Sequence, residues 1–148
     1  MSHSHQKRRE MLRFIKYCTV GALNTLLTLG VIFVCKSVLE INPYVSNALG
    51  YIVGVLNSFL WNKKWVFKSH GCTSREAVKF LAGFGVCYVL QFITVWCLNQ
   101  SSFGDIELQL AVFTLSGYGL ATLIGNVVYT VANFIYNRLV TFKGGRGE

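Results

Sequence analysis

The amino-acid sequence predicts an all-α integral membrane protein with four transmembrane helices. Hydrophobic residues make up 53% of its 148 residues, and charged residues only 14%. The charged residues also gather in short stretches, which leaves four long segments without any charged side chain. A soluble helical bundle would show a polar stripe along each helix, and these segments have none.

Each uncharged segment is long enough to cross a bilayer as one helix. The segments cover residues 17–35, 43–61, 80–98 and 108–136, and the first three are equal in length. At about 1.5 Å per residue, a helix of that length extends about 28 Å, close to the roughly 30 Å hydrocarbon core. The fourth segment is considerably longer than one span requires.

The basic residues predict how these helices are oriented. Of the fourteen Lys and Arg residues, five precede the first helix, five lie between the second and third, and three follow the fourth. Only Lys36 remains for the opposite side, and the third connection carries Asp105 and Glu107. The positive-inside rule therefore predicts a multi-pass protein of the inner (cytoplasmic) membrane, with both termini in the cytoplasm.

This topology accounts for the net charge of +8 without a nucleic-acid partner. Basic residues at the cytoplasmic face attract anionic membrane lipids by about 1 kcal/mol each. Nucleic-acid binding would need a folded basic domain, for which the connections are too short. The sequence thus divides into a basic tail of residues 1–12, a membrane domain of residues 13–143 and a cytoplasmic tail of residues 144–148.

A repeated motif indicates that the membrane domain consists of two related helical hairpins. The pattern Phe-x-x-Asn-[Lys/Arg]-x-x-x-Phe-Lys begins at Phe59 and occurs again from Phe134. Each repeat contains two helices, an even number, so the repeats at about residues 13–68 and 79–143 should share one orientation. We therefore expect parallel repeats whose basic ends lie on the same side of the membrane.

The offset between the two motif copies predicts where the fourth helix begins. Gly50 and Gly125 are separated by the same offset as Phe59 and Phe134, which places the start of the fourth helix near Gly117. The long fourth segment then divides into a membrane span and a leftover apolar piece of about residues 106–116. We expect this piece to form an interfacial helix at the outer face.

The predicted spans contain carboxamides but no ionisable side chain at mid-depth. A carboxamide in hydrocarbon needs a hydrogen-bond partner, so it should face the bundle or a wet cavity. Both interhelical bonding and ligand binding remain open for some of these residues, namely Asn24, Asn47, Gln91 and Asn126.

The motif pairs Asn62 with Lys63 and Asn137 with Arg138 where each repeat leaves the membrane. A cation beside an amide suits a phosphate headgroup, because the cation supplies charge and the amide a directional donor. The alternative is anchorage by snorkelling cations and an aromatic belt at headgroup depth. The belt would consist of Trp61, Trp65, Phe67 and Phe142.

Other chemistries find little support in the sequence. It shows no carboxylate pair, no Gly-rich phosphate loop, no metal-ligand spacing and no nucleophile with a plausible base, so we expect no enzyme, no metal and no cofactor. Proton-coupled export needs a titratable group inside the membrane, and the small multidrug exporters use a glutamate in their first helix. The first span here offers only Asn24 and threonines at that depth.

The chain resembles the GtrA family of small membrane proteins over about residues 13 to 143. The Asn-Lys-x-Trp-Val-Phe element at a helix exit is the more specific part of the resemblance, and Lys63 departs from the arginine that the family often has there. The matching elements are Arg13-Phe14, Val20-Gly21, Asn24-Thr25, Asn47, Gly50-Tyr51, Asn57-x-Phe59-x-x-Asn62-Lys63-x-Trp65-Val66-Phe67 and Asn133-Phe134-x-x-Asn137-Arg138-x-Val140-x-Phe142.

The resemblance implies translocation of a polyprenyl-phosphate-linked sugar to the outer leaflet, where a membrane glycosyltransferase uses it for cell-surface polysaccharide. The alternative is a partner that recruits or stabilises such a glycosyltransferase without moving lipid. Four short helices enclose little space, so a homo-oligomer is compatible with the sequence. The residues expected to bind the lipid phosphate or sugar are Asn62, Lys63, Asn137, Arg138, Arg13, Asn24, Asn57 and Asn133.

Overall fold

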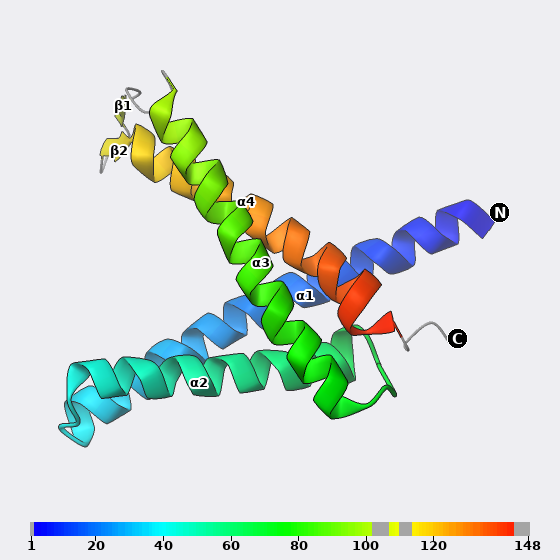
Figure 1. Cartoon of the computed structure of the whole chain (residues 1–148), viewed down its shortest axis with the longest axis horizontal. Helices are drawn as coiled ribbons and strands as arrows, with labels where there is room; N and C mark the ends of the chain where they lie inside the picture. The colour runs from blue at the N-terminus through cyan, green and yellow to red at the C-terminus, as the bar shows by residue number, and fades with distance from the viewer. Residues whose placement is uncertain (1, 102–106, 110–113, 144–148) are drawn as a thin grey trace. The chain divides into compact units, whose positions relative to one another are not determined.

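A computed structural model describes residues 2–101, 107–109 and 114–143 (Figure 1). The predicted C-terminal tail, residues 144–148, lies outside the described residues. The chain divides into two units, of which the first comprises Met1–Gly71 with Phe142–Glu148 and the second Cys72–Thr141. Phe142 and Lys143, which the sequence places in the second repeat, belong to the first unit.

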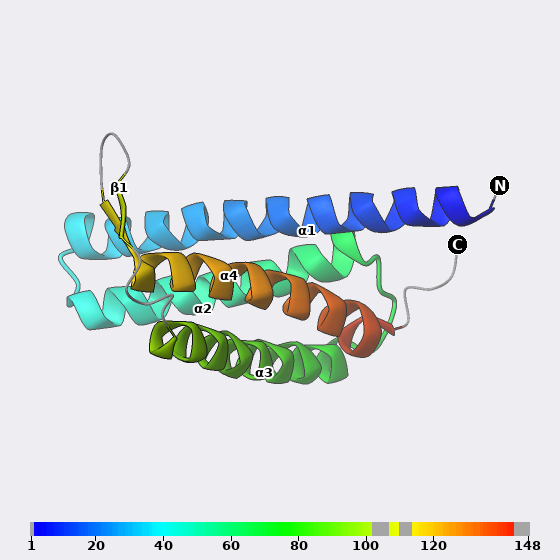
Figure 2. The ribbon, with the colours of Figure 1, turned by 90° about the horizontal axis from the view of Figure 1, so that it is seen from above.

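The first unit is an antiparallel pair of long helices. Helix α1 covers Ser2–Phe33 and continues into a π-helical turn, η1, at Val34–Val38. Helix α2 covers Pro43–Trp61 and continues into a second π-helical turn, η2, at Asn62–Val66. Figures 1 and 2 both show α1 and α2 side by side along the length of α2.

The start of α2 follows from its local sequence. The Oδ1 atom of Asn42 accepts a 2.9 Å hydrogen bond from the backbone N–H of Tyr44, which caps the helix. Pro43 occupies the first helical position, where the missing N–H costs nothing and the fixed φ suits the helix.

The second unit repeats the same arrangement. Helix α3 covers Thr73–Gln100, and helix α4 covers Gly117–Tyr136 and continues into a π-helical turn, η4, at Asn137–Thr141. Ser116 caps α4, because its Oγ accepts a hydrogen bond from the N–H of Gly119 at 3.3 Å. The start predicted for the fourth helix from the repeat offset is confirmed.

The interfacial helix expected at about residues 106–116 is wrong for the part of that segment that the structure describes. Strands β1, Glu107–Gln109, and β2, Thr114–Ser116, form an antiparallel hairpin with Leu108 opposite Leu115. Residues 110–113 lie outside the described part of the chain. Polar and apolar residues alternate from Glu107 to Gln109 and from Thr114 to Ser116, and this period of two is typical of a strand.

Small residues bring the helices of each hairpin together. A methyl group on Gly50 of α2 would lie 3.1 Å from the carbonyl oxygen of Thr28 in α1 and would also meet the side chain of Ile32. A methyl group on Gly125 of α4 would lie 2.6 Å from Cγ2 of Val95 in α3. In lipid, such close backbone approach is a main source of helix association.

The helices have the length and surface of membrane spans. Three of them are long and apolar enough to cross a bilayer, at His5–Val38, Thr73–Gln100 and Gly117–Thr141. Helix α2 has 19 residues, enough to cross a bilayer by length, but it is not one of these three. Large apolar side chains such as Leu26 and Phe92 are 67% and 63% exposed, as lipid-facing residues would be. The predicted all-α class with four helices is confirmed.

Candidate functional site

Both copies of the repeated motif form a π-helical turn at the same position. The turns cover Asn62–Val66 and Asn137–Thr141, each directly after the last α-helical residue. In the first copy the N–H of Phe67 donates to the carbonyl of Asn62 at 2.9 Å, five residues back instead of four. Helix α1 also ends in a π-helical turn, at Val34–Val38, where the N–H of Leu39 donates to the carbonyl of Val34. The turn is therefore a shared feature of these helix ends and does not by itself mark the motif as a functional site.

The residue that follows the first motif copy's π-helical turn and Phe67, Lys68, has a left-handed backbone conformation. Lys68 has φ of 48°, an uncommon conformation for a residue with a Cβ. The N–H of Ser69 then donates to the carbonyl of Lys63 at 2.9 Å, which closes the helix end.

The motif asparagines are buried and bond to their own helices. Asn62 is 2% exposed, and its Nδ2 donates to the carbonyl of Ser58 at 2.8 Å and lies 3.2 Å from the Ser58 hydroxyl. Asn137 is 0% exposed, and its Nδ2 donates to Oδ1 of Asn133 at 3.1 Å. Ser58 and Asn133 hold equivalent positions in the two repeats, so each motif asparagine bonds to the equivalent residue one turn earlier.

Each of these amides has an acceptor without a partner. The Oδ1 atoms of Asn62 and Asn137 are buried and have no hydrogen-bond partner among the described residues. Leaving a buried acceptor unpaired costs roughly 1–3 kcal/mol. A hydroxyl group or a water molecule can satisfy it, whereas a phosphodiester anion cannot, because it has no hydrogen to donate.

The motif cations are half-buried. In the first unit, Nζ of Lys63 donates to the carbonyl oxygen of Gly71 at 2.7 Å, which fastens the loop that follows η2. In the second unit, Arg138 occupies the equivalent position in η4. Lys63 thus has a structural bond in addition to the phosphate role expected from the sequence.

The aromatic residues of the motif divide into a buried and an exposed set. Phe67 stacks on Phe142 with ring centroids 5.0 Å apart, and both rings are buried. Phe59 also stacks on Phe142, at 6.0 Å. Trp61 and Trp65 are instead 51% and 36% exposed. The aromatic belt considered from the sequence can therefore include the tryptophans but not these phenylalanines.

Neutral amides link the two helices of each hairpin. In the first unit, Nδ2 of Asn57 in α2 donates to Oδ1 of Asn24 in α1 at 3.3 Å. In the second unit, Nε2 of Gln91 in α3 donates to Oδ1 of Asn126 in α4 at 2.7 Å. Asn47 bonds instead to its own helix, through the carbonyl of Pro43. Interhelical bonding is therefore observed for Asn24, Gln91 and Asn126.

The structure thus brings together some of the eight expected residues. Asn24 meets Asn57, and Asn133 meets Asn137. Arg13 forms an ion pair with Glu10 on its own helix, at 3.3 Å.

Two contributors, Ser58 and Tyr129, are missing from the expected set. Tyr129 accepts a weak 3.4 Å contact from Nδ2 of Asn133. Both sit four residues before their partners, a spacing that helical periodicity makes visible in the sequence.

Comparison with known proteins assigns the chain to a family. Residues 16–142 match the family described as GtrA/DPMS, transmembrane domain. The chain belongs to this family. Its four helices therefore form a GtrA/DPMS transmembrane domain that covers most of the chain, and it is a membrane protein.

Several relatives of this GtrA/DPMS chain have functional names. It is 25% identical to the cell wall teichoic acid glycosylation protein GtcA of Listeria innocua, over 87% of this chain and 83% of that protein. It is 26% identical to the bactoprenol-linked glucose translocase of Shigella phage SfV, over 90% of this chain and 97% of that protein. It is also 29% identical to the uncharacterized membrane protein YngA of Bacillus subtilis, over 86% of this chain and 77% of that protein.

Proposed function

We propose that this protein translocates a polyprenyl-phosphate-linked sugar across the cytoplasmic membrane for cell-surface polysaccharide synthesis or modification. One observation carries the proposal: the chain aligns with 97% of a relative named bactoprenol-linked glucose translocase. Bactoprenol is a polyprenol, so that name specifies both the lipid and the movement. A second relative is named for glycosylation of cell wall teichoic acid, a surface polymer.

The polar groups of the two hairpins support this proposal. A sugar headgroup that crosses the membrane exchanges its water for protein hydrogen bonds, and an unpaired hydroxyl in hydrocarbon costs several kcal/mol. The Asn57–Asn24 and Gln91–Asn126 pairs are neutral donors and acceptors within the spans. The unpaired Oδ1 atoms of Asn62 and Asn137 lie at the basic ends of the hairpins but are buried in this structure, so a headgroup reaches them only if the surrounding helices separate.

The charge distribution supports the direction of entry. With both termini in the cytoplasm, the motif cations Lys63 and Arg138 belong to the cytoplasmic ends of α2 and α4. There they attract a phosphate headgroup from the leaflet in which lipid-linked sugars are made. The polyprenyl tail stays in lipid throughout, and no catalytic step is involved.

Reconstitution of the purified chain tests the proposal. Vesicles carry a trace of fluorescently headgroup-labelled polyprenyl phosphoglucose, and an impermeant quencher reports the fraction in the outer leaflet. We expect lipid from the inner leaflet to become accessible with the protein and to remain protected in protein-free vesicles.

The same assay separates translocation from the alternative role of a non-transporting partner. Accessibility equal to that of protein-free vesicles, together with co-purification of a membrane glycosyltransferase, would support the partner role. A homo-oligomer remains part of the proposal, and the mass of the reconstituted particle in detergent measures it.

A further inference from the structure

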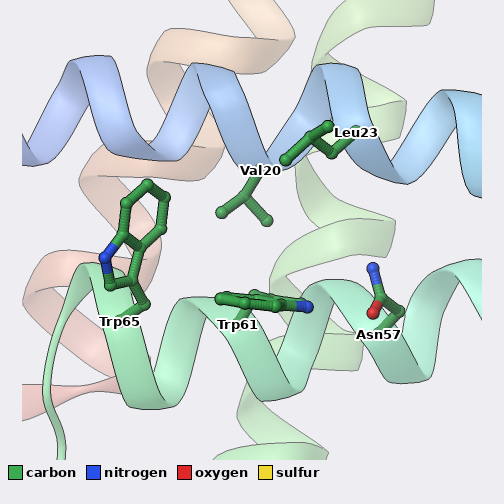
Figure 3. Close-up of a pocket in the computed structure, with 5 residues that line it drawn as sticks. All are labelled: Val20, Leu23, Asn57, Trp61 and Trp65. Carbon is green, nitrogen blue, oxygen red and sulfur yellow. The ribbon is translucent and has the colours of Figure 1, made fainter.

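A pocket of about 240 Å³ lies between α1 and α2 in the first unit (Figure 3). Val20 and Leu23 line it from α1. Asn57, Trp61 and Trp65 line it from α2 and η2. In Figure 3 both indole rings lie between the two helices, with Val20 and Leu23 opposite Trp61.

The pocket is apolar and reaches the surface of the hairpin. Val20 is buried, whereas Trp61 and Leu23 are 51% and 57% exposed, so the pocket can be entered from the side of the helices. Asn57 is the single polar lining residue, and its amide nitrogen already donates to Asn24. The walls therefore offer apolar contacts and few partners for hydroxyl groups.

A positive charge stands beside this pocket. Nζ of Lys16 lies 5.2 Å from the ring centroid of Trp65, a cation–π distance. Lys16 precedes Val20 by four residues, so both lie on the same face of α1. The pocket thus combines an apolar interior with a cation at its basic end.

We propose that this pocket seats the isoprene units nearest the phosphate of a polyprenyl phosphate, with Lys16 contacting the phosphate itself. The inference rests on the proposed function and specifies how the lipid is recognised. Charge complementarity places the phosphate at Lys16, and the apolar walls then face the first part of the tail. Methyl-branched isoprene units are wider than a straight acyl chain, which suits a pocket walled by flat indole rings.

The pocket lies in the first repeat, and its lining residues from α2 and η2 are not repeated in the second. At the repeat offset, Asn57, Trp61 and Trp65 correspond to Ala132, Tyr136 and Val140. In the second unit the ring of Tyr136 packs directly on Gly83. Recognition of the tail is therefore assigned to the first hairpin alone.

Tryptophan emission tests this inference on the full chain in detergent. The chain has three tryptophans, so Trp96→Phe leaves only the two pocket residues as reporters. Undecaprenyl phosphate should change their emission in a saturable way. Glucose 1-phosphate, which lacks the tail, should not, and phosphatidic acid, which has straight chains, should compete about ten-fold more weakly.

Matched variants separate the tail from the phosphate. Leu23→Phe fills the pocket and should weaken undecaprenyl phosphate binding about ten-fold, or about 1.4 kcal/mol, while Leu26→Phe, on the lipid-exposed side of α1, should not. Lys16→Gln should weaken binding of undecaprenyl phosphate but not of undecaprenol. Lys36→Gln, at the other end of the helix, should leave both unchanged.

Each contrary result has a definite meaning. Equal effects of Leu23→Phe and Leu26→Phe, or equal competition by phosphatidic acid, would overturn the isoprenoid assignment. A response to glucose 1-phosphate alone would make the pocket a headgroup site. If vesicles show no translocation but undecaprenyl phosphate still binds here, the proposed transport is wrong and the pocket stands. If vesicles show translocation but undecaprenyl phosphate causes no emission change, the pocket assignment is wrong and the proposed transport stands.

Discussion

Asn62 and Asn137 hold equivalent positions in two helices, and both direct the amide nitrogen to the preceding turn. The repeat identifies these positions from sequence alone. Their hydrogen bonds to the preceding turn were not predicted, because the motif pairs each amide with the cation that follows it. The π-helical turn that begins at each asparagine includes one additional residue. In a helix of 3.6 residues per turn, one extra residue rotates every later side chain by about 100°. The same sequence in an unbroken α-helix would present other residues to the neighbouring helix.

The first prediction concerns these two amides. Asn62→Ala combined with Asn137→Ala should lower translocation of the lipid-linked sugar at least about ten-fold, since a lost interaction of about 1.4 kcal/mol has that effect. The fold should persist, because a hydrogen bond within a membrane bundle contributes only about 0.6 kcal/mol. The vesicle assay measures translocation, and thermal unfolding in detergent measures the fold.

Asn47→Ala is the matched control for that experiment. Asn47 also bonds one turn back, to the carbonyl of Pro43 at 3.0 Å, but it is exposed and lies at the opposite end of α2. Equal losses in the control and the double variant would assign the motif asparagines to helix packing only.

At the scale of whole elements, the sequence predicted four helices and the start of α4 correctly. The lengths of the uncharged segments predicted the four helices, and the offset between Gly50 and Gly125 predicted the start of α4. The β1–β2 hairpin was missed because the apolar content of the segment was weighed and its alternation was not. The π-helical turns have no comparable signal in composition. They end α1 as well as α2 and α4, so they belong to the helix ends and not to the motif alone, and only coordinates reveal them.

Helix pairing yields the second prediction. Gly50→Ala should destabilise the first hairpin by about 1–3 kcal/mol, because the new methyl group meets Ile32 and the carbonyl of Thr28 in a packed interface. Gly21→Ala is the control, since nothing lies within 4 Å of its added methyl group. It should be neutral, or stabilising by up to about 1 kcal/mol through helix propensity.

Unfolding of both variants by heat in the same detergent measures the difference. If Gly50→Ala unfolds at the temperature of the unsubstituted chain, the close approach of α1 and α2 does not contribute to stability. That outcome would free Gly50 for a contact with a second copy of the chain.

At the scale of the whole molecule, the third prediction is the orientation in the membrane, which follows from the distribution of Lys and Arg residues. Two single-cysteine variants test it, one that keeps the native Cys72 and one that carries Ser37→Cys with all five native cysteines replaced. Both positions are exposed, and they lie in connections on opposite sides of the membrane domain. An impermeant maleimide should label residue 37 in intact cells and Cys72 only after permeabilisation. The opposite pattern would invert the proposed topology and the direction of transport.

The last prediction concerns energy coupling. Coupling to a proton gradient requires a group that gains and loses a proton within the membrane, and the usual groups are Asp, Glu, Lys or His. The four uncharged segments contain none of these residues. The polar pairs observed within the spans, Asn57–Asn24 and Gln91–Asn126, are neutral carboxamides that do not titrate.

Translocation should therefore run down the gradient of the lipid-linked sugar alone, and its rate in sealed vesicles should be unchanged by a protonophore. A pH-sensitive dye inside the vesicles verifies that the proton gradient has collapsed. Loss of translocation under those conditions would mean that a charged residue outside the uncharged segments, such as Glu76 near the start of α3, takes part in the transport cycle.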